Sequence, residues 1–150
     1  MKAFYHPHQK LHHPKTYLSR GQMRAPQEVP ERVDGILQGL ANLKLDVYEP
    51  DDHGIAPIAA VHDARYLEFL QTAYQQWQEV SEDWGEEVMS NVYIREPNPL
   101  RGILGQAARF LADGSCPVGQ HTWASAYWAA QSAIAATKTA WSYMKFMASS

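Results

Sequence analysis

The chain has 150 residues and a mass of 17.0 kDa, the size of one domain, so we expect residues 1–150 to fold as a single domain. Hydrophobic residues make up 45% and charged residues 19%, which excludes a disordered or coiled-coil chain. A net charge of −3 without a long basic run argues against nucleic-acid binding, and a single cysteine excludes an internal disulfide framework and a Cys-rich zinc site.

The N-terminal residues and the distribution of apolar residues bear on the compartment. The first ten residues lack the uninterrupted apolar stretch of a signal peptide. No uncharged apolar run reaches the roughly 18–20 residues that a membrane span needs. We therefore expect a cytoplasmic protein with no membrane partner.

The first third of the chain has the pattern of a strand, a helix and a second strand. Lys2–Tyr5 is a short candidate strand, and residues 6–30 form a long loop rich in His and Pro. Pro30 suits the first turn of a helix. Apolar residues then recur at helical spacing, namely Val33, Ile36, Leu37, Leu40 and Leu43. Leu45–Tyr48 follows as a second strand, so the segment predicts a parallel crossover unit.

The rest of the chain is predicted to be mainly helical. Residues 60–79 form a strong helix with Asp63 in its first turn, residues 81–100 a polar segment, and residues 103–111 an amphipathic helix. Thr122 is a plausible N-cap for a last helix. That helix is apolar most of the way round, which implies burial on nearly all sides. We expect a mostly helical α/β fold with about four helices and at most a two-stranded parallel sheet.

Three stretches are similar to a known family: PERVDGIL at 30–37, HGIAPIAAVHDARYLEFLQTAYQQW at 53–77 and GQAARFLADGSCPVGQHTWASA at 105–126. They resemble the N-terminal part of histone deacetylase-like proteins, and the middle stretch is most similar to the bacterial acetylpolyamine amidohydrolases. The resemblance covers about residues 1–135. Residues 136–150, at the end of the last helix, do not resemble the family.

The resemblance implies the N-terminal part of a zinc-dependent amidohydrolase on an α/β fold with a parallel sheet. Such enzymes remove acetyl groups from polyamines or acetyl-lysine-like amines. Their zinc ligands and catalytic groups come from a tandem-His loop after Pro-Gly, a His-His-Gly-Asn-Gly segment, a later Asp and a late Tyr, and none of these occurs in the 150 residues. We therefore assign no catalytic residue, no metal ligand and no cofactor to this chain, and expect it to be inactive alone.

Some residues with reactive side chains have two interpretations. The His-rich loop either holds an adventitious metal ion or is simply polar, and the second interpretation is favoured; its residues are His6, His8, His12 and His13. His62 and Asp63 are better explained as the start of a helix than as a catalytic pair. Cys116 is better explained as a structural or surface thiol than as a nucleophile.

The resemblance also places residues 14–26 near the family's substrate channel and dimer contact. Acidic and aromatic groups there favour cationic substrates in acetylpolyamine amidohydrolases. Here the region offers Tyr17, Ser19 and Arg20, and Ser115 stands where another acidic residue is expected. This departure weakens the expectation of a polyamine preference.

Assembly and partners follow from the apolar last helix. Exposing several large apolar side chains would forfeit an energy comparable to the stability of a domain, about 5–15 kcal/mol. We expect a homo-oligomer, a dimer or a tetramer, although the other helices could cover this helix alone. The predicted interface residues are Trp123, Tyr127, Trp128, Ile134, Trp141 and Met144.

Three functions remain open at this stage. The chain is an inactive, self-associating part of a deacetylase-like domain, a module that binds a small cationic or acetylated amine ligand, or a relic of a longer enzyme. The long loops and the aromatic content favour the second, and the unfamiliar residues after about Ala136 favour the third.

Overall fold

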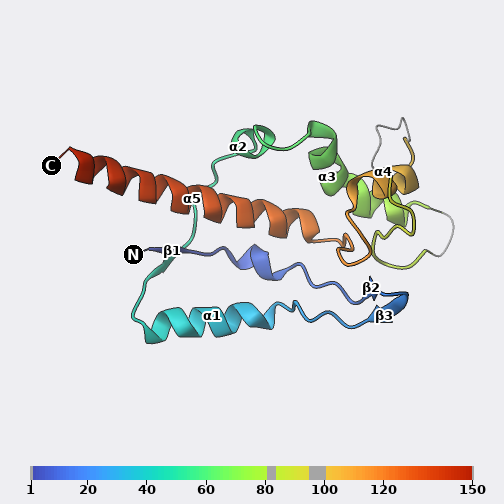
Figure 1. The fold of residues 1–150 in the computed structure, drawn as a ribbon, viewed down its shortest axis with the longest axis horizontal. Helices are drawn as coiled ribbons and strands as arrows, with labels where there is room; N and C mark the ends of the chain where they lie inside the picture. Colours follow the sequence, from blue (N-terminus) through green and yellow to red (C-terminus); the bar gives the residue numbers. More distant parts are fainter. Residues whose placement is uncertain (1, 81–83, 95–100, 150) are drawn as a thin grey trace. The chain divides into compact units, whose positions relative to one another are not determined.

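The computed structural model describes residues 2–80, 84–94 and 101–149, and these group into two compact units (Figure 1). Unit 1 comprises residues 1–11, 30–61 and 124–150, and unit 2 comprises residues 12–29 and 62–123. The expectation that the chain forms one domain stays a prediction.

Unit 1 contains the predicted parallel crossover. Strand β1 (Ala3–Phe4) pairs in parallel with β4 (Val47–Tyr48), and helix α1 (Glu31–Asn42) lies between them in the sequence. The remaining elements are η1 (Pro7–Lys10), α2 (Ala56–Ala59) and most of α5 (Thr122–Ala148). The mostly helical α/β fold with two parallel strands is thus confirmed.

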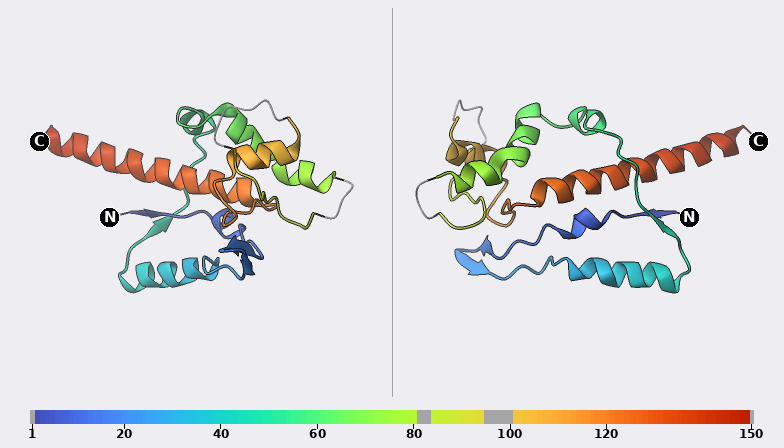
Figure 2. Two further views of the ribbon diagram at one scale, coloured as in Figure 1. Left: turned by 45° about the vertical axis from the view of Figure 1, so that its right-hand side comes forward. Right: turned by 180° about the vertical axis from the view of Figure 1, so that it is seen from behind.

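The N-terminal segment with β1 and η1 lies between α1 and α5 in all views (Figures 1 and 2). Lys10 forms an ion pair with Asp34 of α1 at 2.6 Å. On the other side, Ser125 Oγ of α5 donates a hydrogen bond to the carbonyl of Gln9 at 2.7 Å. The segment therefore ties the two helices of this unit together through polar contacts.

Unit 2 contains a hairpin where the sequence suggested only a loop. Strands β2 (Tyr17–Ser19) and β3 (Gln22–Arg24) pair antiparallel. The two residues between them, Arg20 and Gly21, both adopt positive φ, 52° and 75°. Positive φ at both central residues is typical of the two-residue hairpin turn whose twist matches that of the strands. Gly21 was therefore the one residue in the sequence that could have indicated this hairpin.

Helix α3 (Ala64–Gln78) begins after Asp63, whose side chain accepts a hydrogen bond from the backbone N–H of Arg65. The predicted helix over 60–79 is therefore correct in its body, but the helix begins only at Ala64; residues 60–63 connect it to the separate short helix α2, which ends at Ala59. Helix α4 (Ile103–Phe110) lies within the predicted range. Residues 81–83 and 95–100 of the predicted polar segment lie outside the described residues.

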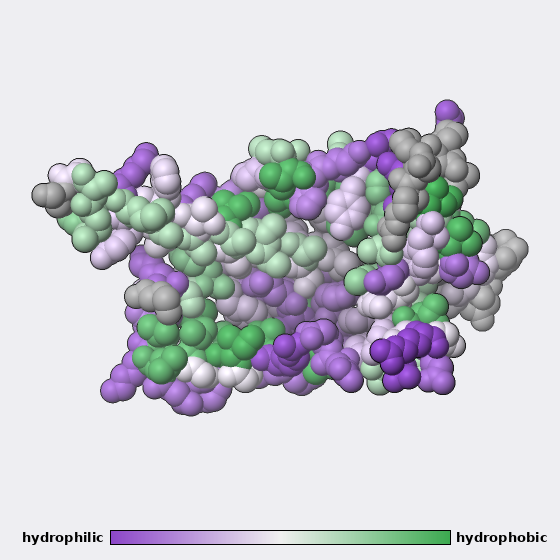
Figure 3. Space-filling view, in the orientation of Figure 1, coloured by the Kyte–Doolittle hydropathy of each residue, from purple (hydrophilic) through white to green (hydrophobic). Residues whose placement is uncertain are grey.

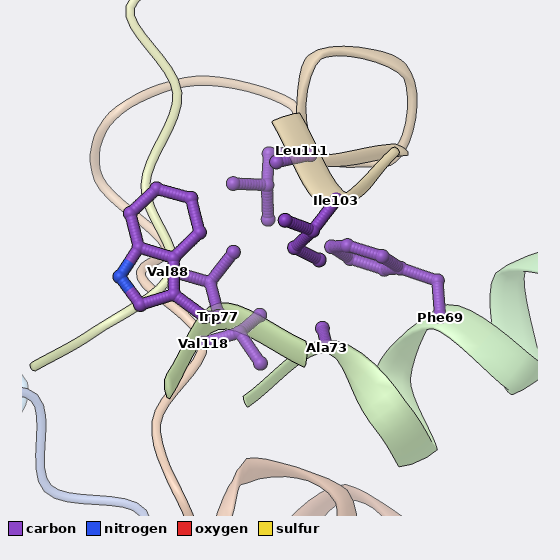
Figure 4. Packing of buried hydrophobic residues seen from close by; sticks show 8 residues of the cluster. Phe69, Ala73, Trp77, Val88, Ile103, Leu111 and Val118 are labelled. Carbon is purple, nitrogen blue, oxygen red and sulfur yellow. The ribbon is translucent and has the colours of Figure 1, made fainter. Parts of the chain in front are cut away.

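The hydrophobic core lies in unit 2, where α3 and α4 pack together (Figure 4). Val88 and Val118 exchange two backbone hydrogen bonds of 2.8 and 3.0 Å, which holds two loops against the helices. Trp77 closes one end and donates its indole N–H to the carbonyl of Gly85. The core residues are Phe69, Ala73, Trp77, Val88, Ile103, Ala107, Leu111 and Val118.

Unit 1 has almost no apolar core. Of the twelve buried hydrophobic residues in the described part of the chain, ten lie in unit 2, and only Ile58 and Ala135 lie in unit 1. Helix α1 is amphipathic and yet buries no residue. Apolar surface is visible over both α1 and the C-terminal half of α5 (Figure 3). Parallel strands are normally buried on both faces, whereas β1 is only half-buried and β4 is exposed.

The long helix α5 differs from the expectation of burial on nearly all sides. Its buried residues are the polar Ser125, Gln131 and Ser132, together with Ala135. Gln131 is fully buried because its amide donates to the carbonyl of Gly54 and accepts from the backbone N–H of His53. Residues 136–149 are exposed apart from the half-buried Thr139.

Two further predictions concern this helix. Thr122 was predicted as the N-cap, the residue just before the helix, but it is the first residue of the helix itself. Its hydroxyl accepts a hydrogen bond from the backbone N–H of Gly119. Among the described residues, no helix is both long enough and apolar enough to cross a membrane.

Candidate functional site

A small cavity beside the β2–β3 hairpin brings together residues of the predicted substrate loop. Its volume is about 230 Å³, and it lies entirely within unit 2. Tyr17 of β2 and Ser115 both line it, so the structure places these two sequence-predicted positions together. The full lining is Pro14, Tyr17, Pro26, Gln27, Glu28 and Ser115.

Close backbone contact joins strand β2 to the turn at Gly114, next to the cavity. The backbone N–H of Leu18 donates to the carbonyl of Gly114 at 2.8 Å. A Cβ at position 114 would lie only 2.8 Å from Leu18 Cβ, so only glycine permits this approach. Asp113 then accepts from the backbone N–H of Ser115 at 2.7 Å, which turns the chain so that Ser115 faces the cavity.

A second anchor fixes the N-terminal edge of the same loop. The backbone N–H of Lys15 donates to both carboxylate oxygens of Glu87, at 3.2 and 3.3 Å, and the Lys15 ammonium pairs with Glu86. Thr122 Oγ1 lies 3.0 Å from His12 Nδ1. These contacts position Pro14 and Tyr17 relative to the core.

The electrostatics of the cavity favour a positive ligand. Glu28 carries the one charge of the described lining. Tyr17 adds an aromatic ring, and Ser115 and Gln27 add polar groups. A carboxylate beside an aromatic ring suits an ammonium group. Glu28 could not be found from the sequence because ten residues and an unexpected hairpin separate it from Tyr17.

The cysteine next to this cavity has the properties of an unreactive thiol. Partial burial, and then the charge of Asp113, raise the pKa of Cys116 above its ordinary value. A raised pKa keeps the thiol protonated at neutral pH, and the protonated form is a poor nucleophile. This supports the structural interpretation over the catalytic one.

His6 and His12 of the N-terminal loop make contacts within the chain. His6 stacks on Trp128 with ring centroids 3.6 Å apart, and its Nδ1 accepts from the backbone N–H of His8. His12 is half-buried, and burial lowers its pKa, with a smaller contribution from His13. His12 is therefore neutral near pH 7.

The pair His62 and Asp63 is at the start of α3, as interpreted. Asp63 caps the helix and forms an ion pair with Arg65 at 2.7 Å. The hydrogen bonds from Arg65 lower the pKa of Asp63 to about 2. The His62 ring lies 5.8 Å from that of Tyr66. A carboxyl group with so low a pKa is a poor general base, so the structural role is favoured.

The predicted interface residues have very different surroundings. Trp123, Tyr127, Trp128 and Ile134 are half-buried, and Tyr127 donates its hydroxyl hydrogen to Asp52. Trp141 and Met144 are more than half exposed, and the Lys145 ammonium lies 5.6 Å from the Trp141 ring centroid. Within this single chain, therefore, only the last two leave much apolar surface to cover.

Comparisons with known proteins show what the chain is similar to. No family sequence model matches the chain. It is 62% identical over 136 residues to the acetylpolyamine amidohydrolase of Burkholderia pseudomallei, and 31% identical over 137 residues to that of Mycoplana ramosa. These alignments cover 91% and 89% of this chain and 40% of each relative. A crystal structure of the Burkholderia pseudomallei acetylpolyamine aminohydrolase superposes with a TM-score of 0.90 at 60% identity, over 93% of this chain and 41% of that one.

This chain is homologous to the N-terminal part of the acetylpolyamine amidohydrolases. It spans about 40% of the length of the curated relatives that it matches. The recognition made from residues 30–37, 53–77 and 105–126 is thereby confirmed, and so is its coverage of most of the chain.

The zinc implied by resemblance to the acetylpolyamine amidohydrolases does not fit the residues described here. Within 2–80, 84–94 and 101–149, no group of three His, Cys, Asp or Glu side chains could hold a metal ion. The closest histidines in the sequence, His12 and His13, contribute to no such group, and the Nδ1 of His12 is occupied by Thr122. No catalytic step through zinc can be derived from these side chains.

Proposed function

We propose that these 150 residues form a non-catalytic scaffold of the acetylpolyamine amidohydrolase type, which self-associates through the C-terminal half of α5. The observation that carries this proposal is the uncovered apolar surface of unit 1. Five large side chains of α5 are each more than half exposed, namely Trp141, Tyr143, Met144, Phe146 and Met147. We call this set the α5 patch.

The energy available from covering the α5 patch is large. Full burial of one such side chain contributes about 1.5–3 kcal/mol. With each already partly covered, five of them together offer roughly 5 kcal/mol or more, which is comparable to the lower end of domain stability. Large exposed apolar patches are typical of interaction surfaces, which supports the proposal.

The composition of the helix supports a second copy as the occupant. The described part of α5 contains no acidic residue, and its only cations are Lys138 and Lys145. Lys138 Nζ lies 3.1 Å from His53 Nδ1, and Lys145 lies over Trp141. These contacts hold both ammonium groups beside groups of the same chain, and the five large side chains of the α5 patch are uncharged, so the patch can offer apolar surface to a second copy across a two-fold axis.

Sedimentation velocity of the whole chain at about 10 µM tests self-association. We expect a mass of at least twice 17.0 kDa for the wild type, and a monomer for the double variant Trp141→Ser and Phe146→Ser. Val61→Ser is the matched control, because Val61 is 78% exposed in the same unit but lies off the patch. A monomeric wild type, or a control that dissociates as readily as the double variant, contradicts the proposal.

Metal content and hydrolysis test the absence of catalysis. We expect less than one zinc per ten chains, roughly, after purification in the presence of zinc, and no release of acetate from acetylated polyamines. One zinc per chain together with turnover that a chelator abolishes would show that the scaffold proposal is wrong.

A second candidate function is a binding module for a small cationic or acetylated amine. The cavity with Glu28 and Tyr17 favours it, because a carboxylate and an aromatic ring converge on a small volume. In a thermal-shift assay we expect mono-acetylated putrescine to stabilise the wild type and Glu28→Gln to lose that shift. Glu49→Gln, an exposed acid outside the cavity, should keep it. No shift with the wild type would refute this function alone.

A further inference from the structure

Unit 1 has a second uncovered surface, on helix α1 and separate from the α5 patch. The helix buries none of its residues, although its apolar residues recur at helical spacing. Ile36 and Leu43, two turns apart on one side of the helix, are 61% and 72% exposed. Gly39 lies between them on the same side, and the space above it is open. We call these three residues the α1 face, and the chain itself leaves this face uncovered.

The parallel strands that α1 connects are also incomplete. Among the described residues, their sheet consists of β1 and β4, so each strand has one unpaired edge. The backbone N–H of Ala3 donates to the carbonyl of Asp46 at 3.3 Å, and that of Tyr5 to the carbonyl of Tyr48 at 3.0 Å. Backbone groups of alternate residues point to opposite edges, so Phe4 directs its N–H and carbonyl away from β4. Two strands alone are marginally stable in water, and they need further strands or cover.

The relatives of this chain contain the residues that could complete such a sheet. The chain spans about 40% of the relatives that it matches, so more than half of each relative lies outside the match. Residues 30–37, which include the start of α1, are among the stretches that resemble the family. The α5 patch, by contrast, lies within residues 136–150, which do not resemble it. The α1 face therefore belongs to the shared part of the fold, and the α5 patch does not.

We infer that the α1 face and the β1–β4 strand pair form a docking surface for the C-terminal part of an acetylpolyamine amidohydrolase chain, the part beyond the match. The shared part superposes on the solved relative with a TM-score of 0.90, so its backbone keeps the shape that such a partner fits. The partner would place apolar side chains over Ile36 and Leu43 and a strand beside an unpaired edge. A second copy suits the surface less well, because it brings the same two-stranded sheet with the same missing neighbours.

Co-expression tests the inference. The full chain of 150 residues is produced together with an affinity-tagged segment of the Burkholderia pseudomallei relative that begins where its alignment with this chain ends. We expect the tag to capture one copy of the chain per segment, counted by native mass spectrometry. Ile36→Ser combined with Leu43→Ser should lower the captured amount about tenfold, because each serine places a hydroxyl in an apolar contact. Val61→Ser is the matched control, since Val61 is 78% exposed in the same unit but lies on neither α1 nor the strands.

The outcomes separate this inference from self-association through the α5 patch. Trp141→Ser combined with Phe146→Ser should leave capture at the wild-type level, because both residues lie outside the α1 face. An insoluble segment, a soluble segment that carries no chain, or equal loss of capture in the Val61 control overturns the inference. Unchanged capture of the Ile36 and Leu43 double variant overturns it too. If that double variant is monomeric without the segment while the wild type is a dimer, a second copy covers the α1 face, and the inference is wrong. Circular dichroism melts verify that each variant is folded.

Discussion

Substitution of Gly114 by alanine should open the contact that shapes the Tyr17 cavity. The new Cβ would lie 2.8 Å from Leu18 Cβ, 3.2 Å from Leu18 Cδ2 and 3.3 Å from the hydroxyl oxygen of Tyr93. Ordinary contact begins at 3.4 Å, so the backbone near Leu18 has to retreat by about 0.6 Å, the difference between 3.4 and 2.8 Å. Leu18 Cβ is next to the main chain, and rotation of the side chain cannot relieve the clash.

The expected loss of stability combines two effects. Overpacking of this kind costs about 1–3 kcal/mol, and the 2.8 Å hydrogen bond from Leu18 to Gly114 weakens as strand β2 and the turn at Gly114 move apart. We expect the free energy of unfolding to fall by about 2 kcal/mol, and the melting temperature by about 4–8 °C for a chain of this size. Urea unfolding followed by circular dichroism measures the first, and a thermal melt measures the second.

Gly35→Ala provides the control with the opposite sign. Position 35 is inside α1, has no atom within 4 Å of a new Cβ, and does not need a positive φ. The same chemical change should therefore stabilise the chain by up to about 1 kcal/mol. If Gly114→Ala unfolds at the same urea concentration as the wild type, residues 114 and 18 are not packed as tightly as described, and the reasoning is wrong.

Two further predictions concern ionisable groups. Asp63→Asn keeps a cap on α3 but removes the charge. Because the folded pKa of Asp63 is lowered to about 2, the stability that its charge contributes is present above the ordinary pKa of about 4 and is lost as the pH falls toward 2. The melting temperature should therefore fall less steeply between pH 5 and pH 2 in the variant than in the wild type. His12 should titrate below the ordinary imidazole value of about 6.5 in a proton NMR titration, because its half-buried ring disfavours the charge; a value at or above 6.5 would show that the ring is not buried against Thr122.

The helices could be predicted well from the sequence because their signals are local. Apolar spacing from Val33 to Leu43 predicted α1, and Asp63 marked the start of α3. The hairpin was missed because its strands are three residues long and exposed or half-buried, so they show no alternation of apolar and polar residues.

The candidate site could be predicted only in part. Tyr17 and Ser115 were singled out by the family resemblance, and the structure brings them to one cavity. Glu28 reaches the same place through a tertiary arrangement that no local pattern encodes.

The sequence shows that α5 is apolar most of the way round, but the residues that this helix buries within the chain are mostly polar and were not expected to be buried. Gln131 and Ser132 are buried because the adjoining segments offer backbone and side-chain partners, Gly54 and Gln9. Hydrophobic periodicity cannot foresee a buried polar side chain that is satisfied by a distant loop. The exposed remainder is the α5 patch.

Amide hydrogen exchange of residues 136–148, followed as a function of protein concentration, tests the α5 patch most directly. If a second copy covers this half of the helix, its protection should rise steeply between about 1 and 100 µM, while the core helix α3 exchanges at the same rate throughout. Fast exchange of residues 136–148 at every concentration would contradict self-association through this surface.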